Sequence, residues 1–285
     1  MLQGTRYSCG RQILWNVFAF ANFYSKLHAY FEKMSWMGLA NLSEKFFSLL
    51  LVNEFYSRLI RHADEYENPA RFRSDNLYTF IDGQERVITE SDLGKLIGCE
   101  FYDGPSELPS PYPVENVWNT LAREPGCKKM ALNLKSLPLR FLHHFIASTI
   151  QCRTGSFAKV TIEDIWLLKM ASTGTKINLV GFIIKKMLKI LREKEKETTS
   201  KRKKTSLSLF AIPYVTLITH YAKSVEILQS KYEMVQIVVV YNLATIAKMG
   251  YKDPNNIGNF VKIRGDEGEE DEPAQAPEAH NLVRL

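Results

Sequence analysis

Residues 131–189 carry the clearest secondary-structure signals of the chain and read ALNLKSLPLRFLHHFIASTIQCRTGSFAKVTIEDIWLLKMASTGTKINLVGFIIKKMLK. The first of three predicted helices begins near Pro138, because a proline fits the first turn of a helix, and it runs to about Ile150. Its apolar side chains fall on one face at helical spacing: Leu139, Leu142, Phe145 and Ile146. This spacing predicts an amphipathic helix that packs against a core.

Two further helices follow in the same segment. The second opens at Thr161, whose hydroxyl can cap the helix, and Glu163 and Asp164 suit its positive end. It stops at Gly174, since glycine readily takes the left-handed conformation of a helix end. The third covers about 179–191 and has an apolar stripe along one face. Three consecutive amphipathic helices indicate a helical bundle.

Upstream, the sequence predicts a helix followed by a β-hairpin. Ser43 can cap a helix over 43–61, where large apolar residues recur at four-residue spacing. Residues 77–81 and 85–89 have strand character around a short connection in which Gly83 supplies a positive φ. The hairpin is the one strand pair that the sequence predicts with a clear turn.

A short helix, a loop and a charged segment complete the pattern. Thr89 begins a capping sequence ahead of an apolar run, and Gly98 marks its stop. Residues 102–113 hold four prolines and a glycine, which predicts a connecting loop rather than a proline-rich ligand. Residues 192–206, REKEKETTSKRKKTS, contain no hydrophobic residue and form either a solvated helix extension or a flexible loop.

These elements predict a mainly α fold, a multi-helix bundle with one small β-hairpin at about 77–89 and a disordered acidic C-terminal tail. The chain divides into an N-terminal helical segment at 1–37, a helical domain at 38–228 with a flexible charged loop at 192–206, a C-terminal helical extension at 229–262, and the disordered tail at 263–285.

The composition supports a folded core and an uneven charge. Of the 285 residues, 45% are hydrophobic and 12% are aromatic, which argues against disorder over most of the length. The net charge of +6 includes seven acids and no Lys or Arg in residues 265–281. Without these seven acids, the chain has 37 basic and 24 acidic residues, a net charge of +13. A basic body with an acidic tail fits a nucleic-acid partner, and it fits a soluble, self-screened protein equally well.

Cysteines and hydropathy predict an intracellular protein that does not cross a membrane. The four cysteines are isolated, with no CxxC pair, so reduced thiols are expected. The apolar run at 13–23 is about 11 residues long, well short of the roughly 20 needed to span a bilayer. It is interpreted as a core helix or a fragment of one.

No catalytic residue, metal site or cofactor site is predicted. Glycine-rich nucleotide loops are absent, and no Cys/His spacing matches a zinc site. His143 and His144 are adjacent on a helix, so their side chains point about 100° apart and cannot share a metal ion. Carboxylate pairs such as 163–164 and 64–65 are expected at helix caps or on polar surfaces. The sequence therefore predicts that the protein is not an enzyme.

One basic cluster is the candidate functional site. Lys201, Arg202, Lys203 and Lys204 are four adjacent cations within the charged segment. Such a run can bind an acidic nuclear-import receptor or neutralise phosphates, although it also occurs in ordinary solvated loops. Nucleic-acid binding or nuclear import is the functional interpretation, with the nucleus as the expected compartment.

Taken in order, several segments resemble the plant transposon protein domain, a family found in retrotransposon-derived reading frames of plants. The similar segments are LLLVNEFYSRLI (50–61), YTFIDGQERVITESDLGKLIGC (78–99), residues 137–187 and IPYVTLITHYAKSV (212–225). The resemblance covers about 40–226. It implies a mostly helical domain of unknown biochemical role, with no catalytic residues to carry over.

The sequence thus favours a non-enzymatic helical protein, derived from a plant transposable element, that binds protein or nucleic acid. One alternative is a degenerate integrase or nuclease of a retroelement. Another is a self-associating structural protein of a retroelement. The partner and the oligomeric state stay open, and no membrane partner is expected.

Overall fold

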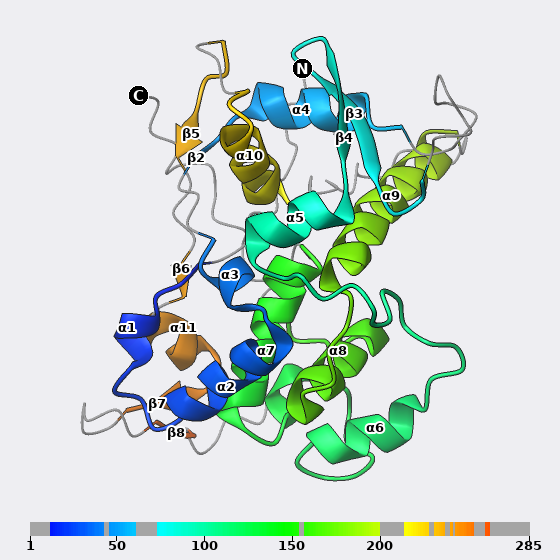
Figure 1. Ribbon diagram of the computed structural model, residues 1–285. Helices are drawn as coiled ribbons and strands as arrows, with labels where there is room; N and C mark the ends of the chain where they lie inside the picture. The colour runs from blue at the N-terminus through cyan, green and yellow to red at the C-terminus, as the bar shows by residue number, and fades with distance from the viewer. Residues whose placement is uncertain are drawn as a thin grey trace.

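The computed structural model describes residues 12–42, 46–60, 73–153, 157–199, 214–227, 231–236, 240–241, 243–253 and 260–262. Its α-helices are α1 (Trp15–Phe18), α2 (Tyr24–Met34), α3 (Met37–Ala40), α4 (Leu49–Ser57), α5 (Glu90–Ile97), α6 (Val114–Leu121), α7 (Leu137–Phe145), α8 (Ile162–Thr173), α9 (Leu179–Thr199), α10 (Val215–Ser224) and α11 (Leu243–Lys248). A 3-10 turn, η3 (Ala131–Asn133), precedes α7, and a π-helical turn, η4 (Ile146–Ile150), continues it. The predicted mainly α fold is confirmed (Figure 1).

The strands of the described residues form pairs rather than a continuous sheet. They are β1 (Gln12–Ile13), β2 (Phe46–Phe47), β3 (Leu77–Ile81), β4 (Gln84–Ile88), β5 (Val235–Gln236), β6 (Val240–Tyr241), β7 (Tyr251–Lys252) and β8 (Val261–Lys262). Strands β3 and β4 form the predicted hairpin, with Leu77 opposite Ile88. Its turn is two residues, Asp82 and Gly83, both with positive φ, which suits the twist of a tight hairpin.

Three short strand pairs were not predicted. β1 pairs with β6 in parallel, β2 with β5 antiparallel, and β7 with β8 antiparallel. Each strand has only two residues, too few for an alternating pattern to be read in the sequence. Two of these pairs join the N-terminal part of the chain to residues 235–241, so they depend on tertiary folding.

The helix predicted over 43–61 is shorter than expected. Residues 43–45 lie outside the described part, and Phe46 and Phe47 are extended because they pair with β5. The helix α4 therefore begins at Leu49, and Ser48 is its cap, with the Ser48 hydroxyl accepting from the Leu51 amide at 3.4 Å. It ends at Ser57, because Ile60 already bridges to the hairpin.

The helix ends that carry capping residues or a terminal glycine lie where the sequence predicts them. Helices α5 and α8 both begin with a capping box, from Thr89 and Thr161, and both end at a glycine with positive φ. Helix α9 begins at Leu179 as predicted but continues to Thr199. Residues 192–199 are thus a helix extension rather than part of a flexible loop, while 200–213 lie outside the described residues.

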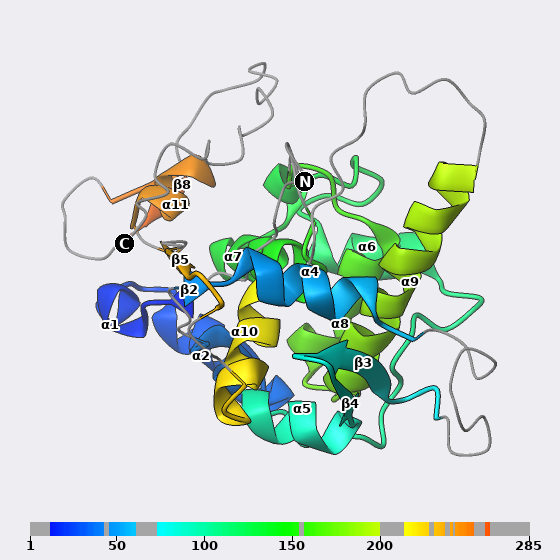
Figure 2. The same cartoon turned by 90° about the horizontal axis from the view of Figure 1, so that it is seen from above.

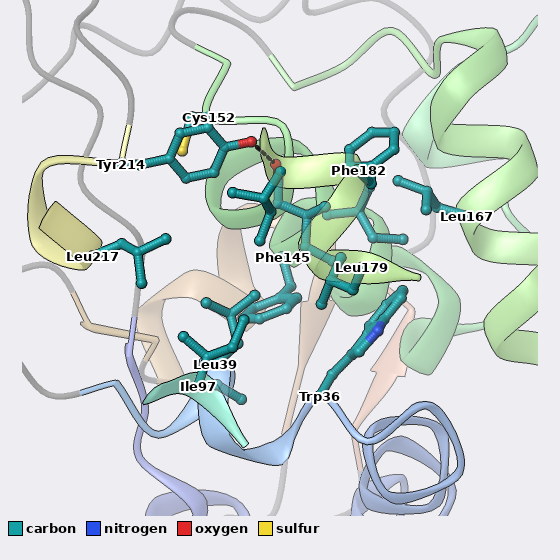
Figure 3. Packing of buried hydrophobic residues seen from close by; sticks show 14 of the residues in the cluster. Trp36, Leu39, Ile97, Phe145, Cys152, Leu167, Leu179, Phe182, Tyr214 and Leu217 are labelled. Carbon is teal, nitrogen blue, oxygen red and sulfur yellow. Dashed lines mark hydrogen bonds between the residues drawn. The ribbon is translucent and has the colours of Figure 1, made fainter. Parts of the chain in front are cut away.

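The predicted separate N-terminal segment, 1–37, belongs in its described part to the main core. The Phe31 ring of α2 lies 4.8 Å from the Phe145 ring, and the Phe18 ring lies 5.4 Å from the Phe141 ring. One cluster of buried side chains extends from Ile13 to Tyr251. Figure 3 shows Trp36 of this segment near Leu179, and Leu39, two residues beyond the segment, near Phe145.

The predicted C-terminal helical extension, 229–262, is helical only at α11 among its described residues, and strands β5 to β8 make up much of the remainder. Tyr241 of β6 is fully buried and its ring lies 4.7 Å from that of Phe141. The predicted disordered tail, 263–285, lies outside the described residues.

The hairpin and α10 lie at the upper end of the molecule in Figure 1, and α6, β7 and β8 lie at the lower end. Seen from above, α11 and β8 lie to one side of α7 (Figure 2). Within the described chain, no helix has the length and apolar composition that a membrane crossing requires. Cys99, Cys127 and Cys152 are free thiols, and Cys9 lies outside the described residues.

Candidate functional site

The sequence-predicted cluster Lys201, Arg202, Lys203 and Lys204 lies outside the described residues. Its role in nucleic-acid binding or nuclear import stays a prediction. The described part of the chain brings together a different set of cations, near the start of α7.

These cations sit on a doubled-back segment between α6 and α7. Ala122 and Leu134 form an antiparallel bridge, with the Arg123 amide donating to Asn133 O at 2.9 Å and the Lys135 amide donating to Leu121 O at 3.0 Å. Residues 121–123 and 133–135 are therefore hydrogen-bonded to each other and close the loop between them.

A second bridge fixes the middle of this loop to residues 158–160, which lie just before α8. Met130 pairs with Lys159, the Ala131 amide donates to Ala158 O at 2.7 Å, and the Val160 amide donates to Lys129 O at 2.9 Å. We call the five cations carried by these two bridged segments the basic platform: Arg123, Lys128, Lys129, Lys135 and Lys159. The support is backbone hydrogen bonding, so the platform has a defined geometry.

The platform is exposed and only partly neutralised. Arg123, Lys128, Lys135 and Lys159 are exposed, and Lys129, which is half-buried, pairs with Glu115. The sequence around the platform is rich in positive charge. Residues 116–160 contain seven Lys or Arg and one acid, whereas residues 74–115 contain two Lys or Arg and nine acids. The hairpin and α5 thus belong to an acidic stretch, and the platform belongs to a basic one.

A buried cation lies beneath the platform. Arg140 is only 2% exposed, and its guanidinium donates to Met249 O at 3.0 Å, to Leu134 O at 3.4 Å and to Leu132 O. Its cationic carbon also lies 5.1 Å from the centre of the Tyr251 ring. These partners are neutral carbonyls and a ring, so the positive charge is solvated without being cancelled.

The pKa of Arg140 is lowered to about 10, mainly by burial, with Tyr251 opposing the shift and the charge of Arg123 adding to it. The group stays protonated at neutral pH. Its coupling to Arg123 places it within the field of the platform. A charge held away from water is poorly screened, so Arg140 strengthens the positive potential above it.

A second polar cluster lies at the junction of α7, residues 151–153 and α8, with its His–Asp pair buried and its Arg153 side chain 22% exposed. One oxygen of Asp164 accepts from the Thr161 amide at 2.7 Å and lies 3.0 Å from Arg153 Nη2 and 3.3 Å from His143 Nε2. The other accepts from Gln151 Nε2 at 2.6 Å. Asp164 is 0% exposed and His143 is 1% exposed.

The electrostatics of Asp164 favour its ionised form. Burial alone would raise its pKa, but the hydrogen bond and charge of His143, the charge of Arg153 and the Thr161 amide lower the pKa below its ordinary value. A His–Asp pair is also the arrangement used for proton transfer in catalysis. Here both oxygens of the carboxylate already accept hydrogen bonds, and both side chains are buried. The contacts of the cluster join three segments, which are α7, residues 151–153 and the start of α8.

This cluster agrees with two sequence expectations. Asp164 caps α8, as predicted, and its burial, which the sequence did not indicate, arises because α7 and residues 151–153 cover the start of α8. Glu163 is the partly exposed member of that pair and contacts Lys186 and Lys189. His143 and His144 face different partners, as predicted, since His144 Nδ1 lies 3.1 Å from the Tyr241 hydroxyl.

The described residues contain no group of three or more His, Cys, Asp or Glu side chains placed to hold a metal ion. A small cavity lies between α3, the 149–152 turn and α10, with a mostly apolar lining: Leu39, Leu42, Thr149, Cys152, Tyr214, Thr216 and Leu217. Figure 3 shows Cys152 and Tyr214 on one side of this region, with the Tyr214 hydroxyl donating to Ile150 O. The enclosed His–Asp pair does not line it.

Comparison of the chain with protein-family models, with curated proteins and with solved structures finds no match. The resemblance to the plant transposon protein domain therefore stays a prediction from the sequence.

Sequence reasoning missed the basic platform because it searched for adjacent cations. Lys128 and Lys129 are the only neighbours in the platform, and the other three members are separated by several residues. A count of charges per segment would have found the contrast between 74–115 and 116–160. The bridges that gather the cations could not be read from the sequence.

Proposed function

We propose that this protein is a non-catalytic, helical nucleic-acid-binding protein that contacts the phosphate backbone through the basic platform. The observation that carries the proposal is the set of exposed cations on a backbone-bridged support above the buried charge of Arg140. Phosphate backbones attract such surfaces independently of sequence, since binding releases condensed counterions.

The proposed contacts are positional rather than base-specific. Lys and Arg on a loop can pair with phosphate oxygens, whereas reading bases requires an element that enters a groove. If all five platform cations met phosphates, the slope of log affinity against log salt on duplex DNA would be about −4 to −5. The Lys129–Glu115 pair reduces the number of free contacts, so a slope nearer −4 is expected.

Origin and compartment form part of the same proposal. The derivation from a plant transposable element is supported by the sequence resemblance alone. The nuclear location is supported by Lys201–Lys204, which could also extend the contact with nucleic acid.

The test compares two matched double variants of the full chain. Arg123→Glu with Lys128→Glu reverses two exposed platform cations that have no side-chain hydrogen bond or ion pair recorded in the described structure. Arg73→Glu with Lys95→Glu makes the same charge change just before the acidic stretch 74–115 and on α5 within it. Binding of fluorescein-labelled DNA and RNA duplexes is measured by anisotropy over a range of salt concentrations.

The platform variant is expected to weaken binding at least about tenfold and to reduce the salt slope by about 2, one for each lost phosphate contact. The control variant is expected to change affinity little, because neither residue belongs to the platform and salt screens exposed charges that make no direct contact with the phosphates. Equal effects of the two variants would contradict the platform assignment. Absence of binding at low salt would contradict nucleic-acid binding altogether and leave protein association as the remaining function.

A further inference from the structure

The last described strand of the chain is connected through β7 to the residues that support the basic platform. Lys262 of β8 pairs with Tyr251 of β7. The Tyr251 ring lies over Arg140, which also hydrogen-bonds Met249 O and Leu132 O. Leu132 belongs to the platform loop, so three successive contacts connect the final strand to that loop: the β8–β7 pairing, the Tyr251 ring on Arg140, and the hydrogen bond from Arg140 to Leu132 O. Figure 1 shows β7, β8 and α6 at the same end of the molecule.

The sequence that follows this strand is acidic. Residues 265–281 contain seven carboxylates and no Lys or Arg: Asp266, Glu267, Glu269, Glu270, Asp271, Glu272 and Glu278. Asp266 is four residues beyond Lys262, and Glu278 is sixteen beyond it. At about 3.3–3.6 Å per extended residue, sixteen residues reach more than about 50 Å. The acidic segment is therefore long enough to reach any part of the platform.

We propose that residues 265–281 bind the basic platform of the same chain and compete there with nucleic acid. The competition rests on the proposed function, whereas the contact between tail and platform does not. The charges are complementary, with seven carboxylates facing four exposed cations and the buried charge of Arg140 behind them. The acidic stretch 74–115 carries nine acids and two cations and repels the same segment.

The tether makes this contact effective even if the isolated segment binds weakly. A short connection holds the segment near its site at an effective concentration on the order of millimolar. A contact with a dissociation constant of about 0.1 mM would then weaken nucleic-acid binding about tenfold by competition. Because the contact is electrostatic, salt weakens it too, and the inhibition is greatest at low salt.

The direct test is zero-length carbodiimide cross-linking of the full chain, mapped by mass spectrometry without nucleic acid. We expect tail carboxylates to link to Lys128, Lys135 and Lys159 and not to Lys95, an exposed lysine in the acidic stretch. Mixing ¹⁴N- and ¹⁵N-labelled protein distinguishes links within one chain from links between chains. Equal linking to Lys95, absence of tail links, or links only between chains would overturn the proposal.

A variant separates charge attraction from simple proximity. Arg123→Glu with Lys128→Glu should abolish the tail links to Lys135 and Lys159, although both amines are still present. Arg73→Glu with Lys95→Glu should leave those links unchanged. Persistence of the links in the platform variant would show that nearness rather than charge produces them and would overturn the proposal.

The competition is tested by replacing the seven tail acids with Asn or Gln in the full chain. Affinity for the labelled DNA duplex should rise about tenfold, and this gain should disappear in the Arg123→Glu, Lys128→Glu background. An equal gain in both backgrounds would point to net charge alone and overturn the competition.

If the tail links form but no duplex binds, the proposed function fails while the contact stands. If the duplex binds and displaces no links, the competition fails while the proposed function stands.

Discussion

At the scale of single residues, two capping boxes of the same type differ in their surroundings. Asp92 at the start of α5 is exposed, whereas Asp164 at the start of α8 is fully buried and contacts His143, Arg153 and Gln151. The local sequence predicts both caps, because a cap depends on residues three apart. It does not predict the burial, because the covering residues come from a different helix.

This difference predicts unequal costs for the same substitution. Asp164→Asn should destabilise the protein by about 3–5 kcal/mol, since it leaves buried partners of a charge pair uncompensated. Asp92→Asn, the matched control, should cost less than about 1 kcal/mol, because Asp92 is exposed and the amide oxygen of asparagine can still accept from the Thr89 backbone amide. Denaturant midpoints at neutral pH measure both, and equal costs would contradict the role of the enclosed cluster.

The same carboxylate predicts a pH dependence. The pKa of Asp164 is lower in the folded state than in the unfolded chain, so its contribution to stability is fully present above the unfolded value of about 3.9. That contribution is lost as the pH falls towards the folded value. Unfolding free energy measured from neutral to acidic pH should therefore fall more steeply in the wild type than in Asp164→Asn. Parallel curves would contradict the lowered pKa.

At the scale of elements, helices with local signals are predictable and those shaped by distant partners are not. Gly98 and Gly174 end their helices as expected, and the hairpin lies where the sequence places it. Helix α4 begins late because β2 pairs with β5, which is far away in the sequence. The platform is a similar case, because its cations are individually visible in the sequence and are gathered only by the bridges at Ala122 and Met130.

The placement of α2 in the core is testable with matched substitutions. Phe31 is fully buried against Phe145, whereas Phe20, in the turn between α1 and α2, is 50% exposed. Phe31→Ala should cost about 3–5 kcal/mol in unfolding free energy, and Phe20→Ala should cost less than about 1 kcal/mol. Similar denaturation midpoints for the two variants would indicate that α2 does not belong to the core.

At the scale of the whole molecule, one buried cluster joins the described parts from Ile13 to Tyr251. The separate N-terminal segment suggested by the sequence therefore shares its stability with the rest of the chain. We expect tryptophan fluorescence, which reports partly on Trp15 and Trp36, to follow the same denaturation curve as far-ultraviolet circular dichroism. An earlier fluorescence transition would show that the N-terminal segment unfolds independently.

We expect the acids concentrated in 74–115 and the cations concentrated in 116–160 to give the molecule an electric dipole. Such a particle turns as it approaches a charged surface, since the field exerts a torque as well as a force. It should therefore adsorb to negatively and positively charged chromatographic resins alike, meeting each with a different end. Its net charge of +6 alone would lead one to expect retention on the negative resin only.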